Sequence, residues 1–358
     1  MVGSVFFGRE PYFKKGSGRV TSRQHIEGLD TFRFIAALWV VFSHGGAFPL
    51  KTALSSPGPV MQVFIGIYDC LFNGVAAVVV FFIISGFCIH YPWVNSVAVD
   101  IRAHLIRRYV RIGIPLLVVV GFVRTMGADF SGAADAVLWS VYCELIYYSL
   151  YPALFVLFRR IGIYTVLVFS ITAALILIAS HDTYLFPMQF PISLNWLVCM
   201  PAWLLGCLLA ERVSHHQLSL KIESLPTWRL AALVYTTAAT VMVFHGPVKI
   251  GYPASMLLFS LFAFFWLERE LCRFLKRRPY VLVEWLGTWS YSVYLIHNLL
   301  IAGISKTTLS PVARWSIMLP AIFVGSYIFA RLVEFPSHQA ARYLALHLRP
   351  KQRLTIDR

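Results

Sequence analysis

The chain has 358 residues, of which 58% are hydrophobic and only 13% charged, and its mean hydropathy is +0.70. A soluble domain of this length could not bury so much apolar surface, so the composition predicts an integral membrane protein. The net charge of +15 would suggest nucleic-acid binding in a soluble protein, but membrane proteins collect Lys and Arg in their cytoplasmic loops, and we therefore reject that function.

Ten mostly apolar segments are long enough, or nearly so, to cross a bilayer as helices. They are residues 29–47, 72–94, 112–125, 136–158, 161–180, 195–211, 229–247, 251–268, 285–305 and 313–334. The third is short. No internal repeat and no appended soluble domain is evident, so the fold class expected is a single all-α bundle of about ten transmembrane helices.

The positive charges test this count. With the N-terminus inside, 24 of the 31 Lys and Arg residues fall in cytoplasmic segments and four in the opposite loops, while Arg33, Arg124 and Arg331 lie within spans. This asymmetry predicts that both termini are cytoplasmic. The expected organisation is a cytoplasmic N-terminal segment (1–28), a transmembrane domain (29–335) and a cytoplasmic basic tail (336–358). The first apolar run follows a basic stretch and is expected to remain as an anchor, not to be cleaved as a signal peptide.

The first span contains the stretch DTFRFIAALWVVFSHGG, in which Arg33 and His44 are separated by ten residues. Eleven residue steps are about three helical turns, so both side chains share one face and lie ~16 Å apart along the axis. A charge facing lipid is unfavourable, so this face is expected to point into the bundle. The alternative is that Arg33 reaches back to the headgroups and His44 caps the far end of the helix.

Later spans carry further polar residues. In the fourth, Ser140, Glu144, Tyr147 and Tyr151 form a stripe on one face. We expect Glu144 to lie at the depth of His44 and to orient its imidazole. The alternatives are a buried, protonated Glu144 bonded to a neighbouring helix, or a Glu144 paired with Arg124. In the ninth span, Ser290, Tyr294 and His297 share a face, and Glu334 at the end of the tenth is expected to pair with Arg331.

Five segments, in this order, resemble the membrane-bound acyltransferase family 3, whose first span carries an Arg, ten residues and a His. They are ISGFCIH (84–90), RRYVRIGIP (107–115), LWSVYCELIYYSLYP (138–152), GTWSYSVYLIHNLL (287–300) and VEFPSHQAARYL (333–344). The resemblance covers nearly the whole chain. It implies a multi-pass protein of the bacterial inner membrane that transfers an acyl group, most often acetyl, from cytoplasmic acyl-CoA to a hydroxyl of an extracytoplasmic carbohydrate or glycoconjugate.

The residues suit this chemistry. A histidine with a pKa near 6.5 can take the hydroxyl proton, so His44 is the expected general base, supported by Glu144. Arginines bind phosphate oxygens in pairs of hydrogen bonds, so Coenzyme A is expected to contact Arg33 and the basic run. The expected cofactor-binding residues are Arg33, Ser85, Arg107, Arg108, Arg111 and Tyr294. For Arg107 to Arg111, an ordinary positive-inside loop is the alternative.

The six cysteines show no CxxC spacing, and most lie in apolar segments, where we expect them to be small buried apolar residues. Neither disulfides nor a metal site is therefore expected. Two other functions remain open: a transporter or flippase, since ten spans with buried charges also describe carriers, and a non-enzymatic sensor on the same fold. Beyond the bilayer, the expected partner is the carbohydrate acceptor. Its identity, the acyl length and the oligomeric state do not follow from the sequence.

Overall fold

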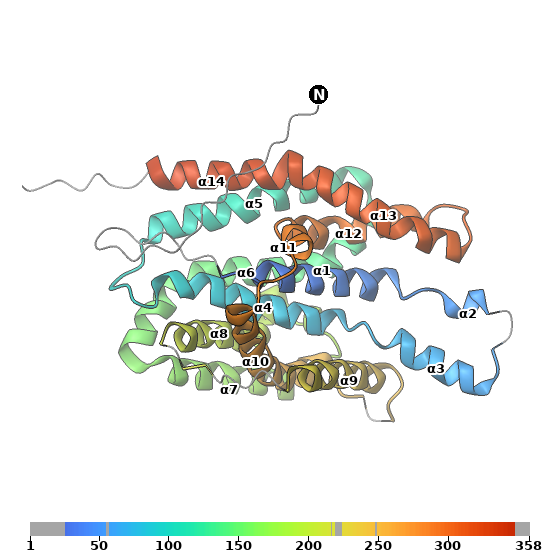
Figure 1. Cartoon of the computed structure of the whole chain (residues 1–358), viewed down its shortest axis with the longest axis horizontal. Helices are drawn as coiled ribbons and strands as arrows, with labels where there is room; N and C mark the ends of the chain where they lie inside the picture. The colour runs from blue at the N-terminus through green and yellow to red at the C-terminus, as the bar shows by residue number, and fades with distance from the viewer. Residues whose placement is uncertain (1–25, 55–56, 216, 219–223, 248, 348–358) are drawn as a thin grey trace, which may run out of the picture.

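The computed structural model describes residues 26–54, 57–215, 217–218, 224–247 and 249–347. The regular structure of these residues is helical throughout, and most long helices run along the long axis of the molecule (Figure 1). The elements are α1 (Leu29–Gly45), α2 (Leu50–Ala53), α3 (Pro59–Asp69), α4 (Gly74–His90), η1 (Tyr91–Trp93), α5 (Ile101–Met126), α6 (Ala128–Ile161), α7 (Ile163–Ser180), η2 (Pro187–Gln189), α8 (Ile192–Ser214), α9 (Leu225–Phe244), α10 (Tyr252–Lys276), α11 (Val281–Gly287), α12 (Ser290–Ser305), α13 (Pro311–Phe329), the π-helical turn η3 (Ala330–Glu334) and α14 (Phe335–His347).

Every predicted span lies on a helix, and the prediction of an all-α membrane protein is confirmed. Seven helical stretches are both long and apolar enough to cross a bilayer: 59–93, 101–126, 130–161, 163–180, 192–214, 225–244 and 311–347. The other three predicted spans fall on α1 and α12, which have 17 and 16 residues, and on α10, whose second half is charged. The count of ten spans therefore stays a prediction.

Two helices begin earlier than the hydropathy predicts. Helix α5 starts at Ile101, where the Asp100 side chain accepts a hydrogen bond from the Ala103 amide, so the predicted short third span is a 26-residue helix. The basic run that we assigned to a loop is thus helical. Helix α6 starts at Ala128 instead of 136. Glu144 consequently lies more than four turns along its helix, deeper in the bundle than expected.

The helix that carries the tenth predicted span does not stop at residue 334. One π-helical turn, η3, joins α13 to α14, which continues to His347 and packs beside α5 (Figure 1). The first part of the predicted basic tail is therefore an ordered helix. Residues 348–358 of that tail and residues 1–25 of the predicted N-terminal segment lie outside the described residues.

Helices α4 and α8 approach each other closely in the bundle core. A Cβ atom on Gly86 would lie 1.9 Å from the Trp203 carbonyl oxygen, and one on Gly206 would lie 2.0 Å from the Ile83 oxygen. Only glycine permits this approach, as is common between membrane helices. This contact fixes the position of α4 against α8. Another face of α4 forms one wall of the cavity described below.

Buried carboxylates tie α10 to its neighbours. The Arg229 guanidinium of α9 donates two hydrogen bonds, of 2.7 and 2.8 Å, to Glu270, which is 1% exposed, and Trp266 donates a third. Arg212 of α8 pairs with Glu268 at 2.7 Å. Because these carboxylates are desolvated, the arginines that neutralise them fix how the charged half of α10 packs.

Candidate active site

Helix α1 carries the two residues around which the site is built. Glu284 of α11 holds its first turn: one carboxylate oxygen accepts the Gly28 amide at 2.9 Å, and the other accepts the Thr31 amide and hydroxyl at 2.9 and 2.6 Å. A carboxylate at this point satisfies amides that the helix leaves free. Arg33 follows one turn later, at what we call the basic end of the bundle. His44 lies in the last turn, at what we call the histidine end.

Arg33 points into the bundle, as the shared-face argument predicts. Its guanidinium donates to Asp30 at 2.7 Å and to the Cys88 sulfur of α4 at 3.2 Å. The side chain faces a cavity of about 360 Å³. The residues that line it come from α1, α4, α5, α6, the α11–α12 region and the C-terminal helices: Asp30, Arg33, Val78, Phe81, Phe82, Ser85, Cys88, Arg108, Arg111, Ile112, Ser140, Val141, Glu144, Tyr148, Gly287, Thr288, Ser290, Tyr291, Tyr294, Glu334, His338 and Arg342.

The basic end of this cavity concentrates positive charge. Arg33, Arg108 and Arg111 line it together, as three of the four predicted arginines. Arg107 is absent from the lining, since it is one position off the face of α5 that carries Arg108 and Arg111. A cluster of guanidinium groups at a cavity mouth suits an anionic ligand with several phosphate oxygens.

Helix α14 adds two cavity residues that the sequence did not single out. His338 accepts a hydrogen bond from the Arg111 side chain at 2.9 Å, and Arg342 lies one turn further on. Both belong to the predicted tail, so no sequence argument connected them with Arg33. The signal that could have found them is the spacing of Glu334, His338 and Arg342, which places all three on one helical face.

Glu144 lies in the middle of the cavity wall, and its partner is not His44. One carboxylate oxygen accepts hydrogen bonds from the Ser85 hydroxyl, at 2.5 Å, and from the Tyr148 hydroxyl. The expected pairing with His44 is therefore wrong, because the early start of α6 carries Glu144 toward the basic end. Of the two alternatives, the bond to a neighbouring helix is observed, through Ser85 of α4, and Arg124 is exposed.

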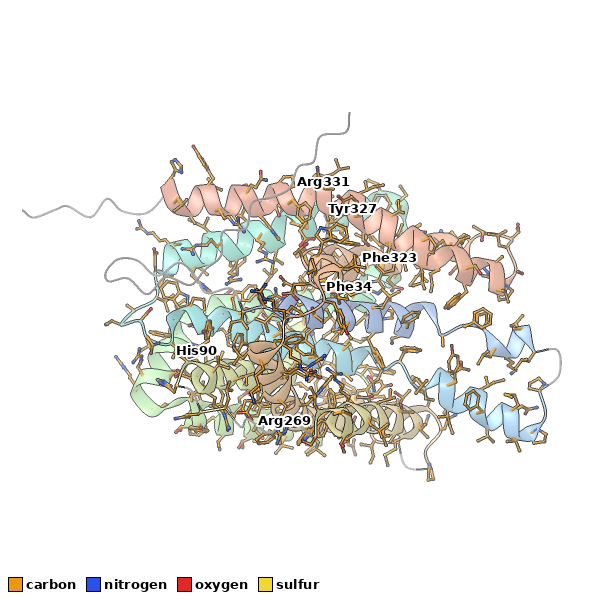
Figure 2. The ribbon with its side chains drawn as sticks, viewed as in Figure 1. Phe34, His90, Arg269, Phe323, Tyr327 and Arg331 are labelled. Atoms are coloured by element: carbon orange, nitrogen blue, oxygen red, sulfur yellow. The ribbon has the colours of Figure 1, made fainter. Side chains whose placement is uncertain are left out.

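The predicted stripe on α6 divides between two environments. Ser140 and Glu144 face the cavity, whereas Tyr147 is fully buried and donates to the Trp196 carbonyl of α8 at 2.7 Å. Tyr151 is also fully buried, against His90, whose place at the end of α4 is labelled in Figure 2. These two tyrosines hold α6 against its neighbours and take no part in the cavity.

Two aromatic rings in contact form part of the cavity wall. The rings of Phe81 and Tyr294 meet edge to face at 5.3 Å, and the Tyr294 hydroxyl is 2.5 Å from the Ser140 hydroxyl. Tyr294 thus lies where the sequence expects it, on the cavity wall. His44 is not part of the lining. Tyr294, which lines the cavity, has its ring 6.1 Å from that of His297, and neither histidine is in the lining.

His44 is paired with a second histidine. Its Nδ1 atom lies 2.8 Å from Nε2 of His297 on α12, and the two ring planes are nearly parallel, at 16°, with centroids 5.1 Å apart. His297 is fully buried, whereas His44 keeps part of its surface exposed. Ser290 and Tyr294 of the same predicted stripe line the cavity, so α12 connects the cavity wall to the histidine pair.

Glu334 also has partners other than the expected one. It is 1% exposed, accepts the Ser292 amide at 3.1 Å and the Ser292 hydroxyl at 2.5 Å, and lies 3.6 Å from His338. Arg331 is exposed on the C-terminal helix (Figure 2), so the predicted Glu334–Arg331 pair is wrong. The π-helical turn inserts an extra residue there and turns Glu334 toward α12.

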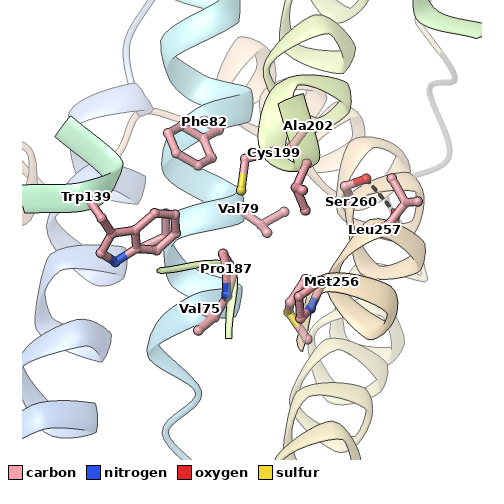
Figure 3. A pocket seen from close by; sticks show the side chains of 13 residues that line it. Val75, Val79, Phe82, Trp139, Pro187, Cys199, Ala202, Met256, Leu257 and Ser260 are labelled. Carbon is pink, nitrogen blue, oxygen red and sulfur yellow. Dashed lines mark hydrogen bonds between the residues drawn. The ribbon is translucent and has the colours of Figure 1, made fainter. Parts of the chain in front are cut away.

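A smaller pocket, of about 20 Å³, lies on the far side of Phe82, among α4, α6, α8 and α10 (Figure 3). Val75, Val79, Trp139 and Met256 give it an apolar lining. It has room for about one water molecule and offers no charged group to a ligand. The larger cavity is therefore the candidate site.

Comparison with known families agrees with this arrangement. A family model described as an acyltransferase domain matches residues 26–331, which include Arg33, His44, Glu144 and His297. The chain belongs to acyltransferase family 3. The match ends before Glu334, His338 and Arg342, so these cavity residues lie outside the matched part of the family 3 domain. Searches of curated proteins and of solved structures gave no match. Family membership and the apolar helices together make the protein a membrane acyltransferase.

Proposed function

We propose that the protein is an O-acyltransferase of the bacterial inner membrane. It takes an acyl group, acetyl in the simplest case, from acyl-CoA at the basic end and transfers it to a hydroxyl of a carbohydrate or glycoconjugate at the histidine end. In this proposal the basic end faces the cytoplasm, in agreement with the distribution of Lys and Arg, and both termini lie on that side.

The cluster of cations supports the donor side of the proposal. Coenzyme A carries several phosphate charges, and Arg33, Arg108, Arg111 and Arg342 converge where they would enter. A volume of about 360 Å³ suits the pantetheine arm better than the whole cofactor, so the nucleotide would stay at the mouth. Along the cavity, the Glu144 carboxylate is a hydrogen-bond acceptor for the amide N–H groups of pantetheine.

The chemistry proposed for the histidine end is general-base catalysis. His44 removes the proton from the acceptor hydroxyl as that oxygen attacks the thioester carbon. The carbon–sulfur bond then breaks, and His44 returns the proton to the departing CoA thiolate, so that an ester and free CoA–SH are formed. Tyr294 lines the cavity and its ring lies 6.1 Å from that of His297, so in this proposal the thioester reaches His44 when the Phe81–Tyr294 contact opens.

One observation carries the proposal: in a family 3 acyltransferase domain, a polar cavity lined by Arg33 extends to Tyr294, whose ring lies 6.1 Å from that of His297, the partner of His44. A base that removes the proton in the transition state contributes about a hundredfold to ten-thousandfold in rate. His44→Gln should therefore lose at least a hundredfold in transfer while the protein remains folded.

The test compares surface glycans by mass spectrometry in cells that lack the protein, carry it, or carry His44→Gln. We expect an acyl-sized mass difference that only the wild type restores. Purified wild-type protein should also release free thiol from acetyl-CoA when glycan from the deletion cells is added. A transporter would release none. Full glycan acylation by His44→Gln would refute the role of His44.

A further inference from the structure

The histidine beside His44 has its own protonation fixed by the backbone. His297 lies on α12, fully buried, and its Nδ1 atom is 2.7 Å from the Tyr294 carbonyl oxygen and 3.1 Å from that of Val293. Carbonyl oxygens only accept hydrogen bonds, so Nδ1 of His297 must carry a proton and donate it. In the neutral imidazole, Nε2 of His297 is then left with a lone pair.

This lone pair determines the state of His44. Nε2 of His297 lies 2.8 Å from Nδ1 of His44, and a hydrogen bond between them requires one donor and one acceptor. Because His297 can only accept there, Nδ1 of His44 must carry the proton. The Nε2 atom of His44 consequently keeps its lone pair, and among the described residues none donates a hydrogen bond to it. This tautomer is the less populated one in free histidine.

We propose that His297 is a positioning residue that holds His44 in the Nδ1–H tautomer and so leaves Nε2 ready to take the acceptor's proton. The proposal rests on the proposed function for the role of His44 as base. When His44 becomes an imidazolium, its Nδ1–H bond to the His297 lone pair strengthens, so His297 also stabilises the charge that forms. It does what the carboxylate does in a Ser–His–Asp triad, without placing an anion in the apolar layer.

The arrangement also explains why the partner is buried and the base is not. His297 has no exposed surface, so water cannot compete for its lone pair, while His44 retains an accessible edge for a substrate. Parallel stacking of the rings alone would leave the tautomer of His44 undetermined. The backbone contacts of His297 are what distinguish a positioning role from simple packing.

The test uses the purified full-length protein labelled with ¹⁵N-histidine, with His44→Gln identifying the signals of His44 by difference. We expect the ¹⁵N shifts of wild-type His44 to report a protonated Nδ1 and an unprotonated Nε2. His297→Leu should abolish this preference, and His297→Gln, whose side-chain oxygen can accept the same hydrogen bond, should restore it. Asn298→Ala is the matched control. Asn298 lies next to His297 on α12 and donates a hydrogen bond to the Ala133 carbonyl of α6, so its loss should leave the tautomer of His44 unchanged.

Activity provides the second measurement. Thiol release from acetyl-CoA should fall in kcat by about a hundredfold or more in His297→Leu and by less than about tenfold in His297→Gln. KM for acetyl-CoA should stay unchanged in both, because the arginines lie at the opposite end. A protonated Nε2 in wild-type His44, or an unaltered tautomer and kcat in His297→Leu, would overturn the inference. If His44→Gln keeps full activity while the tautomer is as expected, the proposed role of His44 as base fails and the tautomer assignment stands. Should His297→Leu not fold, the wild-type spectrum and His297→Gln still decide.

Discussion

Replacing Glu144 by Gln distinguishes the role that the structure supports from the one that the sequence suggested. The carboxylate accepts two hydroxyl hydrogen bonds, from Ser85 and Tyr148. A hydrogen bond to an ionised group contributes roughly 1.5–3 kcal/mol and one between neutral groups roughly 0.5–1.5 kcal/mol. Losing the charge therefore weakens each bond by about 1 kcal/mol. Two such losses, about 2 kcal/mol, correspond to about a thirtyfold change in an equilibrium constant.

Because both bonds lie within the protein, this loss should lower its free energy of unfolding. KM for acyl-CoA should rise, since an amide oxygen is a weaker acceptor than a carboxylate for the pantetheine N–H groups, and kcat should stay unchanged. Ser140, about one turn from Glu144 on α6, contacts Tyr294, and His297 lies almost one further turn along α12. Glu144 is thus ~10 Å from the histidine pair along the bundle. If it were the acid that orients His44, the amide would cost about ten-thousandfold in kcat, as in serine proteases.

The assay is thiol release from acetyl-CoA by purified protein in lipid nanodiscs, with glycan from deletion cells as acceptor and with kcat and KM determined separately. Thermal unfolding of the variant, compared with that of the wild type, controls for folding. A thousandfold loss in kcat at unchanged KM would refute the reasoning and would support a direct contact between Glu144 and His44 during catalysis.

Three further outcomes can be measured. Arg33→Gln should raise KM for acetyl-CoA at least tenfold with little change in kcat, because a charged contact to phosphate is lost; an unchanged KM would remove Arg33 from the donor site. Gly86→Ala should lower the unfolding temperature by several degrees, since overpacking costs about 1–3 kcal/mol, whereas Gly113→Ala, which meets nothing within 4 Å, should be neutral or slightly stabilising; equal effects in scanning fluorimetry would contradict the close α4–α8 contact. Arg229→Ala should destabilise the protein by about 3 kcal/mol because it leaves a buried carboxylate unpaired. Glu270→Gln should cost less, since the half-exposed arginine can turn to solvent; the opposite order in the same measurement would show that the pair is not buried as described.

The class of fold was predictable because lipid restricts the choices. A chain with this hydropathy can satisfy its backbone in a bilayer by forming helices, and each apolar run lies on one. Helix ends were less predictable. The run from Arg102 to Arg111 reads as a loop by charge, yet the Asp100 cap and the packing of α14 hold it as a helix. Hydropathy weighs composition alone and cannot register such contacts.

The direction in which a site residue faces was predictable, because it depends on one helix. The partner of a site residue was not, because it depends on how two helices lie relative to each other. Helical periodicity correctly places Arg33 facing the bundle, since that argument needs only the geometry of α1. The partner of His44 depends on how deep α6 and α12 lie relative to α1. Helix α6 starts eight residues earlier than predicted, which is ~12 Å along its axis. This difference is enough to move Glu144 away from His44, whose partner is His297.

The ring contact between Phe81 and Tyr294 has a consequence for the cell that contains this protein. In the proposed orientation, a continuous water-filled path from Arg33 to His44 would let protons cross the membrane through the protein. It would also admit water to a reactive thioester. If the acyl group moves along the bundle as proposed, the Phe81–Tyr294 contact opens and closes once in each turnover, and between turnovers the closed rings limit the passage of water and ions.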